Sequence, residues 1–167
     1  MASLYDPIRR KPYRPAPDWK LWGTLAICLA VAVAVLTPVL QMIGYERDFR
    51  SFIAQLSTDT VYAYEQDALV VTQDGVTRQG EGKGGYTLYG CIVRAGVGKP
   101  RTDLPAEEPI TVNYGNGSSL QLWEVPMPER GARHPRGVLV HYTAPDGSQY
   151  TYDSDMLQFY EVVNSLR

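Results

Sequence analysis

Cysteine and histidine are scarce in this chain of 167 residues, which contains two of each. Cys28 lies in an apolar stretch and Cys91 is alone in the C-terminal part, so no disulfide can form within that part. A domain there must be held by an ordinary apolar core. His134 and His141, without a His-Glu-x-x-His or Cys-x-x-Cys motif, do not suggest a zinc site, and we expect no cofactor.

Charged side chains are absent from Leu21 to Tyr45, a run of 25 residues. A helix of about 20 such residues crosses a hydrocarbon core of roughly 30 Å. A cleaved signal peptide would have a shorter apolar region that ends at a small-residue cleavage site, which this run lacks. We therefore predict an uncleaved signal anchor, with one transmembrane helix over residues 21–45.

Basic residues on the two sides of the predicted span indicate its orientation. Residues 1–20 contain five Lys or Arg and four Pro, whereas Arg47 and Arg50 follow the span among acidic neighbours. Because basic residues next to a span stay in the cytoplasm, we expect a cytoplasmic N-terminus and an extracytoplasmic domain at the cell membrane. The composition of residues 1–20 predicts a disordered tail.

Basic clusters are missing from the segment that follows the span. Residues 46–167 contain 11 basic and 16 acidic residues, a net charge of −5. A nucleic-acid surface would require clustered Lys and Arg, so we expect no nucleic-acid partner. The segment is long enough for one ordinary domain.

Residues 46–58 follow the span, with Phe49, Phe52, Ile53 and Leu56 at the spacing i, i+3, i+4 and i+7. This spacing places the four apolar side chains on one helical face. We predict a juxtamembrane amphipathic helix that links the span to the domain.

The segment 59–167 has the pattern of an antiparallel sheet. Residues 61–65, 68–73 and 86–95 are rich in β-branched and aromatic residues, which predicts strands. Glycine-containing turns indicate hairpins. These turns lie at residues 74–75, 115–117 and 146–147.

The end of the chain returns to helical spacing, which predicts a C-terminal helix over residues 154–166. The predicted fold class is α+β, with about six to eight strands in hairpins between the juxtamembrane and C-terminal helices. A strand meander followed by one C-terminal helix resembles the order of elements in a pleckstrin-homology barrel, and this resemblance implies a closed, barrel-like sheet.

Three glycines, Gly80, Gly82 and Gly85, form a G-x-G-x-x-G pattern. In dinucleotide-binding folds this pattern ends a strand and opens a helix whose amides meet the pyrophosphate. Because the next residues, 86–95, are predicted as a strand, we interpret the glycines as loop and bend residues rather than a cofactor site.

The segment Tyr89 to Arg94, Tyr-Gly-Cys-Ile-Val-Arg, resembles signatures of two families of envelope cysteine enzymes, the L,D-transpeptidases and the sortases. That resemblance implies a Cys91 nucleophile with a histidine base. Both families place the histidine before the cysteine, whereas His134 and His141 follow Cys91 here. Our leading interpretation therefore assigns no catalytic residue. Catalysis by Cys91 with a histidine is the alternative hypothesis.

Tyrosine is abundant, with 12 residues, most of them on predicted strands. Cross-strand aromatic pairs stabilise sheets, and aromatic residues also concentrate at protein interfaces. Both interpretations stay open. The possible interaction face comprises Tyr86, Tyr89, Tyr114, Trp123, Tyr142 and Tyr152.

These observations favour a single-pass membrane protein whose outer domain binds a protein partner, as an accessory or assembly module of an envelope complex. A transpeptidase-like cysteine enzyme is one alternative. A second alternative is a scaffold subunit of a secretion machine, because such subunits resemble this chain in having one N-terminal span and a small outer domain.

Overall fold

The computed structural model describes residues 18–126 and 136–166. Most of the predicted tail, residues 1–20, and one of the two histidines, His134, lie outside the described residues. The chain divides into two units, residues 1–40 and 41–167, and each is described by itself.

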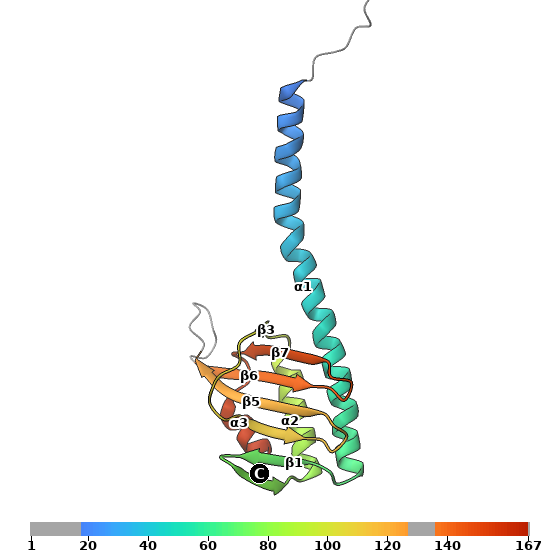
Figure 1. Ribbon diagram of the computed structural model, residues 1–167, viewed down its shortest axis with the longest axis vertical. Coiled ribbons are helices and arrows are strands. Elements are labelled where there is room, and N and C mark those ends of the chain that lie inside the picture. The colour runs from blue at the N-terminus through green and yellow to red at the C-terminus, as the bar shows by residue number, and fades with distance from the viewer. Residues whose placement is uncertain (1–17, 127–135, 167) are drawn as a thin grey trace, which may run out of the picture. The chain divides into compact units, whose positions relative to one another are not determined.

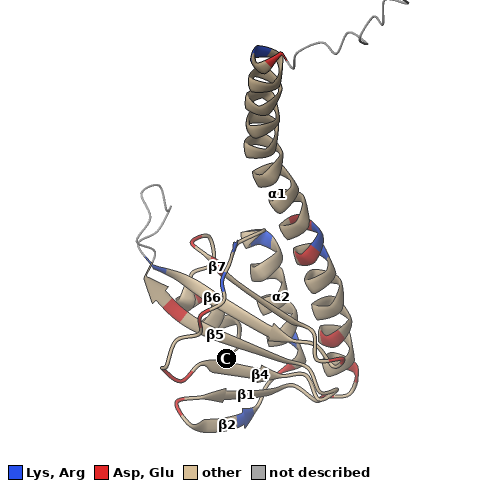
Figure 2. Ribbon diagram, turned by 45° about the horizontal axis from the view of Figure 1, so that its top comes forward, with Lys and Arg blue, Asp and Glu red and all other residues tan. Residues whose placement is uncertain are grey.

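The described part of the first unit is helical and belongs to helix α1, Trp19–Glu65. Its large apolar side chains are exposed, from 50% for Val39 to 79% for Trp19. After the first turn its ribbon carries no charged residue (Figure 2). Among the described helices, α1 is the one long and apolar enough to cross a membrane.

The second unit has an α+β fold, as the sequence predicts. Seven strands of the described residues form one antiparallel sheet in the order β2-β1-β4-β5-β6-β7-β3 (Figure 1). The bounds are β1 Val70–Gln73, β2 Val76–Gln79, β3 Lys99–Pro100, β4 Ile110–Asn113, β5 Ser119–Pro126, β6 Arg136–Thr143, β7 Gln149–Ser154, α2 Gly82–Ala95 and α3 Phe159–Ser165.

The sheet is open, which differs from the barrel that the pleckstrin-homology-like order implies. Strands β2 and β3 are its two edges and are not paired with each other. The chain leaves β2 at one edge, forms α2, and reaches β3 at the opposite edge. This crossing places α2 over one face of the sheet.

One face of the sheet carries the main core. Val71, Leu122 and Val140 of the strands are fully buried in one cluster with Leu56 of α1 and Ile92 of α2. Helix α3 adds Val162 to the same cluster. The same face of the sheet is therefore covered by α2, α3 and the part of α1 that belongs to the second unit.

Helix α1 is longer than its apolar pattern predicts. The buried side chains continue beyond residue 58 to Thr60 and Ala63, on the face that begins with Phe52 and Leu56. The strand prediction for residues 61–65 is therefore wrong. These residues are β-branched and aromatic in composition, but burial at helical spacing determines their conformation.

Helix α2 replaces the strand predicted over residues 86–95. Its buried residues Gly85, Leu88, Cys91 and Ile92 recur at spacings of three and four, which is the helical period. The aromatic and β-branched composition favours a strand, but tertiary packing overrides such preferences.

The hairpin turns are confirmed, and the C-terminal helix is shorter than predicted. Asp74 and Gly75 connect β1 to β2 with φ of 52° and 72°, as a turn with two positive φ angles requires. Residues 154–158 are not helical, because Ser154 still belongs to β7 and its hydroxyl accepts a hydrogen bond from the Met156 amide at 3.3 Å.

The opposite face of the sheet is mostly polar. A row of directly paired residues crosses it from β1 to β7: Thr72, Thr111, Gln121, His141 and Thr151. Beside this row, Trp123, Val125 and Leu139 form a small apolar cluster. The indole of Trp123 donates a hydrogen bond to the Glu107 carbonyl at 2.8 Å, so the β3–β4 connection lies over this cluster.

Candidate binding site

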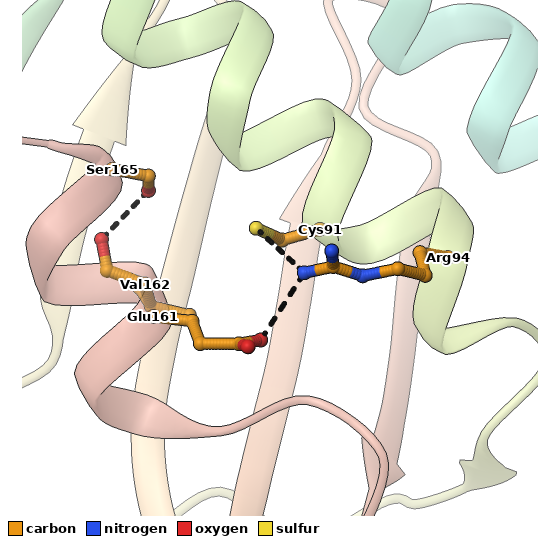
Figure 3. A network of polar contacts seen from close by, with 5 residues as sticks. All are labelled: Cys91, Arg94, Glu161, Val162 and Ser165. Atoms are coloured by element: carbon orange, nitrogen blue, oxygen red, sulfur yellow. Dashed lines mark hydrogen bonds and ion pairs between the residues drawn. The ribbon is translucent and has the colours of Figure 1, made fainter.

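Cys91, the proposed nucleophile of the enzyme hypothesis, lies on α2 and points toward α3 (Figure 3). Its Sγ accepts a hydrogen bond from Arg94 Nη2 at 3.7 Å, and the same nitrogen is 3.4 Å from Glu161 Oε2. Burial raises the pKa of the Cys91 thiol, and the nearby Arg94 opposes this effect only in part. The thiol is therefore protonated at neutral pH and is a poor nucleophile.

His141 lies on the polar face of the sheet. Its neighbours Val140 and Tyr142 belong to the core cluster that contains Cys91, and alternate residues of a strand point to opposite faces. The Nδ1 atom of His141 is 2.6 Å from the Thr151 hydroxyl, and burial lowers its pKa. The sheet thus separates His141 from Cys91, and His134 lies outside the described residues.

The six aromatic residues predicted as a possible interaction face do not share one surface. Tyr114, Tyr142 and Tyr152 are buried in the core, at 1%, 0% and 6% exposure. Trp123 lies on the polar side of the sheet under Glu107. The remaining two lie on α2, where Tyr86 is exposed and Tyr89 is half-buried.

A buried carboxylate connects α1 to the sheet. Asp59 is 4% exposed, and its Oδ1 accepts a hydrogen bond from Asn116 Nδ2 at 2.6 Å. Its Oδ2 accepts a hydrogen bond from the Tyr142 hydroxyl. Burial, with Asp59 nearby, raises the pKa values of Tyr142 and of its neighbour Tyr114. With donors for both oxygens, this cluster is a packing element rather than a reactive site.

A groove of about 210 Å³ lies between α1, strand β7 and the segment that leads from α2 into β3. Because it is concave and lined mostly by aromatic side chains, we treat this groove as the candidate binding site. Its lining residues are Tyr45, Asp48, Phe49, Phe52, Val97, Gly98, Pro100, Gln149, Tyr150, Thr151 and Tyr152.

Aromatic rings dominate the groove and hold one another in place. The ring of Tyr152 is 5.6 Å from the rings of both Phe49 and Phe52, centroid to centroid, and Tyr150 is 5.9 Å from Phe52. Edge-to-face and tilted contacts at these distances are favourable. The aromatic wall is therefore formed in advance of any ligand.

Two polar features complete the groove. Asp48 is the one charged residue among the lining residues, and it has no ion-pair partner among the described residues. The hydroxyl of Tyr152 is buried and has no hydrogen-bond partner in the part of the chain that the structure describes. The groove thus combines π-faces with a carboxylate.

The glycine pattern at Gly80, Gly82 and Gly85 does lead from a strand into a helix, contrary to the sequence-based expectation. Other residues of the chain nevertheless pack closely against these glycines. A Cβ at Gly82 would be 2.7 Å from the Tyr64 ring, and a Cβ at Gly80 would be 3.0 Å from Leu69 Cδ2. Gly85 is buried, and a Cβ there would be 3.5 Å from Leu69 Cδ2. Close packing therefore explains these glycines, and we assign no phosphate site to them.

Within residues 18–126 and 136–166, no three His, Cys, Asp or Glu side chains lie close enough together to hold a metal ion. No family model, curated protein or solved structure matches the chain.

Proposed function

We propose that the protein is a single-pass membrane protein whose C-terminal domain acts outside the cytoplasm by binding, as an accessory or assembly module of an envelope complex. The span is residues 21–45, with the N-terminus in the cytoplasm. The strand-bearing part of the domain is 59–167. Residues 46–58 link it to the span within the same helix and add Phe52 and Leu56 to its core.

The observation that carries the proposal is the exposure of apolar side chains on α1. Every large apolar residue from Trp19 to Ile43 is at least 50% exposed. Contiguous apolar surface of this size is rare on soluble monomers and indicates a membrane or protein interface. The absence of charge over 25 residues favours the bilayer.

Binding is the role that the domain supports best. The Cys91 thiol is buried with a raised pKa, and His141 is on the other side of the sheet. The preformed aromatic groove, by contrast, is a concave surface with one carboxylate at its wall. This contrast favours a binding module over a cysteine enzyme.

The test uses two reporter proteins, each fused after Arg167 and expressed in cells. A reporter that is active only outside the cytoplasm should be active, and one active only inside should be silent. The protein should remain in the membrane fraction after alkaline carbonate extraction. A matched chain that lacks residues 21–45 should be released. Cytoplasmic activity of the fusion would contradict the orientation, and extraction by carbonate would contradict the anchor.

A further inference from the structure

The aromatic groove has the composition of a cation site. Tyr45, Phe49 and Tyr150 line it with exposed or half-buried rings, and Asp48 adds a carboxylate. The buried rings of Phe52 and Tyr152 pack behind Phe49 and Tyr150. A cation placed over an aromatic face is attracted by the ring quadrupole, and quaternary ammonium groups are typically recognised in this way. No lysine or arginine lines the groove, so its charge complements a positive ligand.

The neighbouring charges leave Asp48 available. Arg50 pairs with Glu46 at 3.6 Å, as expected for residues four apart on a helix. Lys99 is opposite Asp153 in the β3–β7 pair, and Asp153 points to the polar face. Successive strand residues point to opposite faces, so the register directs Lys99 away from the groove.

The position of the groove along α1 suggests the source of the cation. Tyr45 is both the last residue of the uncharged run and a lining residue of the groove. At 1.5 Å per residue, Asp48 and Phe52 lie about 5 and 10 Å further along the helix. The headgroup layer on each side of a hydrocarbon core is roughly 5–8 Å thick.

We infer that the groove binds the ammonium-bearing headgroup of a zwitterionic phospholipid, with Asp48 and the surrounding rings as its partners. The inference rests on the proposed membrane anchor, because it requires the mouth of the groove to lie at headgroup depth. Such a lipid would be held beside the domain at the point where the chain leaves the bilayer.

The experiment uses the full-length chain in an uncharged maltoside detergent, to which lipids of identical acyl chains are added singly. Native mass spectrometry measures the fraction of chains that retain one lipid. Phosphatidylcholine and phosphatidylethanolamine should be retained about fivefold better than phosphatidylglycerol, which has no ammonium group. Reconstitution into nanodiscs of each lipid tests the anchor separately.

The variants separate the groove from general effects of charge. Asp48→Asn should reduce the preference to about twofold or less, and Tyr45→Leu should reduce it without changing the melting temperature. The controls lie outside the groove: Glu65→Gln removes a charge from the same helix, and Tyr160→Leu removes an exposed ring from α3. Both controls should keep the fivefold preference.

Each result supports or overturns the inference. Equal retention of the three lipids would show that acyl chains alone bind, and an unchanged preference in Asp48→Asn would place the headgroup elsewhere. If the chain enters nanodiscs but retains none of the lipids, the groove must bind a cationic side chain of a partner protein instead. That result would overturn the lipid inference but not the proposed anchor. Failure to enter nanodiscs would overturn the anchor as well.

Discussion

The hydroxyl of Tyr142, on β6, donates a hydrogen bond to the carboxylate of Asp59, on α1, and both side chains are buried. The two residues are 83 positions apart in the chain. Because a buried carboxylate is costly without donors, this contact specifies where α1 packs on the sheet. It is also a contact that a single substitution can test.

Tyr142→Phe should destabilise the domain by about 1.5–3 kcal/mol, because the Asp59 carboxylate loses a donor and stays buried. Urea unfolding followed by near-ultraviolet circular dichroism measures the change. Tyr150→Phe is the matched control, since this half-buried tyrosine lies on the next strand and packs by its ring. Equal effects of the two substitutions would contradict a specific role for the Asp59 contact.

Two glycines of α2 should respond to alanine in opposite ways. A Cβ at Gly90 meets nothing within 4 Å, so Gly90→Ala should stabilise the helix by about 0.5–1 kcal/mol. A Cβ at Gly84 would be 2.6 Å from the Ser165 carbonyl oxygen, so Gly84→Ala should destabilise the contact between α2 and α3. Thermal unfolding measures whether each variant melts at a higher or lower temperature than the parent. A higher melting temperature for Gly84→Ala would contradict the packing described.

Truncation should show where the folding unit begins. A chain of residues 46–167 retains Phe52 and Leu56, both fully buried, and should unfold cooperatively. A chain of residues 59–167 loses both side chains, each worth roughly 1.5–3 kcal/mol of burial. Against a typical stability of about 5–15 kcal/mol, this loss should leave it largely unfolded. A proton NMR spectrum of the shorter chain with sharp, well-dispersed amide resonances would contradict this expectation.

The Cys91 thiol should react slowly with a neutral thiol reagent in a Cys28→Ala background. Its burial and raised pKa predict fast labelling only after unfolding. Cys91→Ser should cost about 1 kcal/mol of stability, as expected for a polar replacement at a buried site. His141→Gln should leave the labelling rate unchanged, and a slower rate in that variant would revive the cysteine-enzyme hypothesis.

His141 should contribute a pH dependence to stability. Burial lowers its folded pKa below the usual value of 6.5, so the unfolded chain binds the proton more readily than the folded chain. Its stabilising contribution is complete above that value and decreases as the pH falls through the folded pKa. The loss of stability below pH 6.5 should be smaller in His141→Gln than in the parent, and identical pH profiles would contradict this expectation.

The fold class follows from local pattern, because strand pairs joined by glycine turns need little tertiary information. Asp74-Gly75 and Asp146-Gly147 predict their hairpins correctly. Segment 86–95 shows the limit of such reasoning. Its tyrosines and β-branched residues suit a strand, whereas Leu88, Cys91 and Ile92 are buried at helical spacing. Composition and spacing conflict here, and spacing is the better guide.

The groove could be predicted only in part. The spacing of Phe49 and Phe52 indicates an apolar helical face, and Tyr150 and Tyr152 alternate as inward strand residues do. The contact between the phenylalanines and the tyrosines requires β7 to lie beside α1, although β7 comes roughly 100 positions later in the chain. Because no local pattern encodes that contact, neither the groove nor the availability of Asp48 follows from the sequence.

The short strand β3 has a consequence for how copies of the domain behave at high concentration. An open sheet edge can pair with another chain and begin aggregation. Here β3 covers the outer side of β7 with only Lys99 and Pro100. Proline has no amide proton to offer a new strand, and lysine adds a charge that would have to be buried. A high local concentration of the domain should therefore not extend the sheet past this edge.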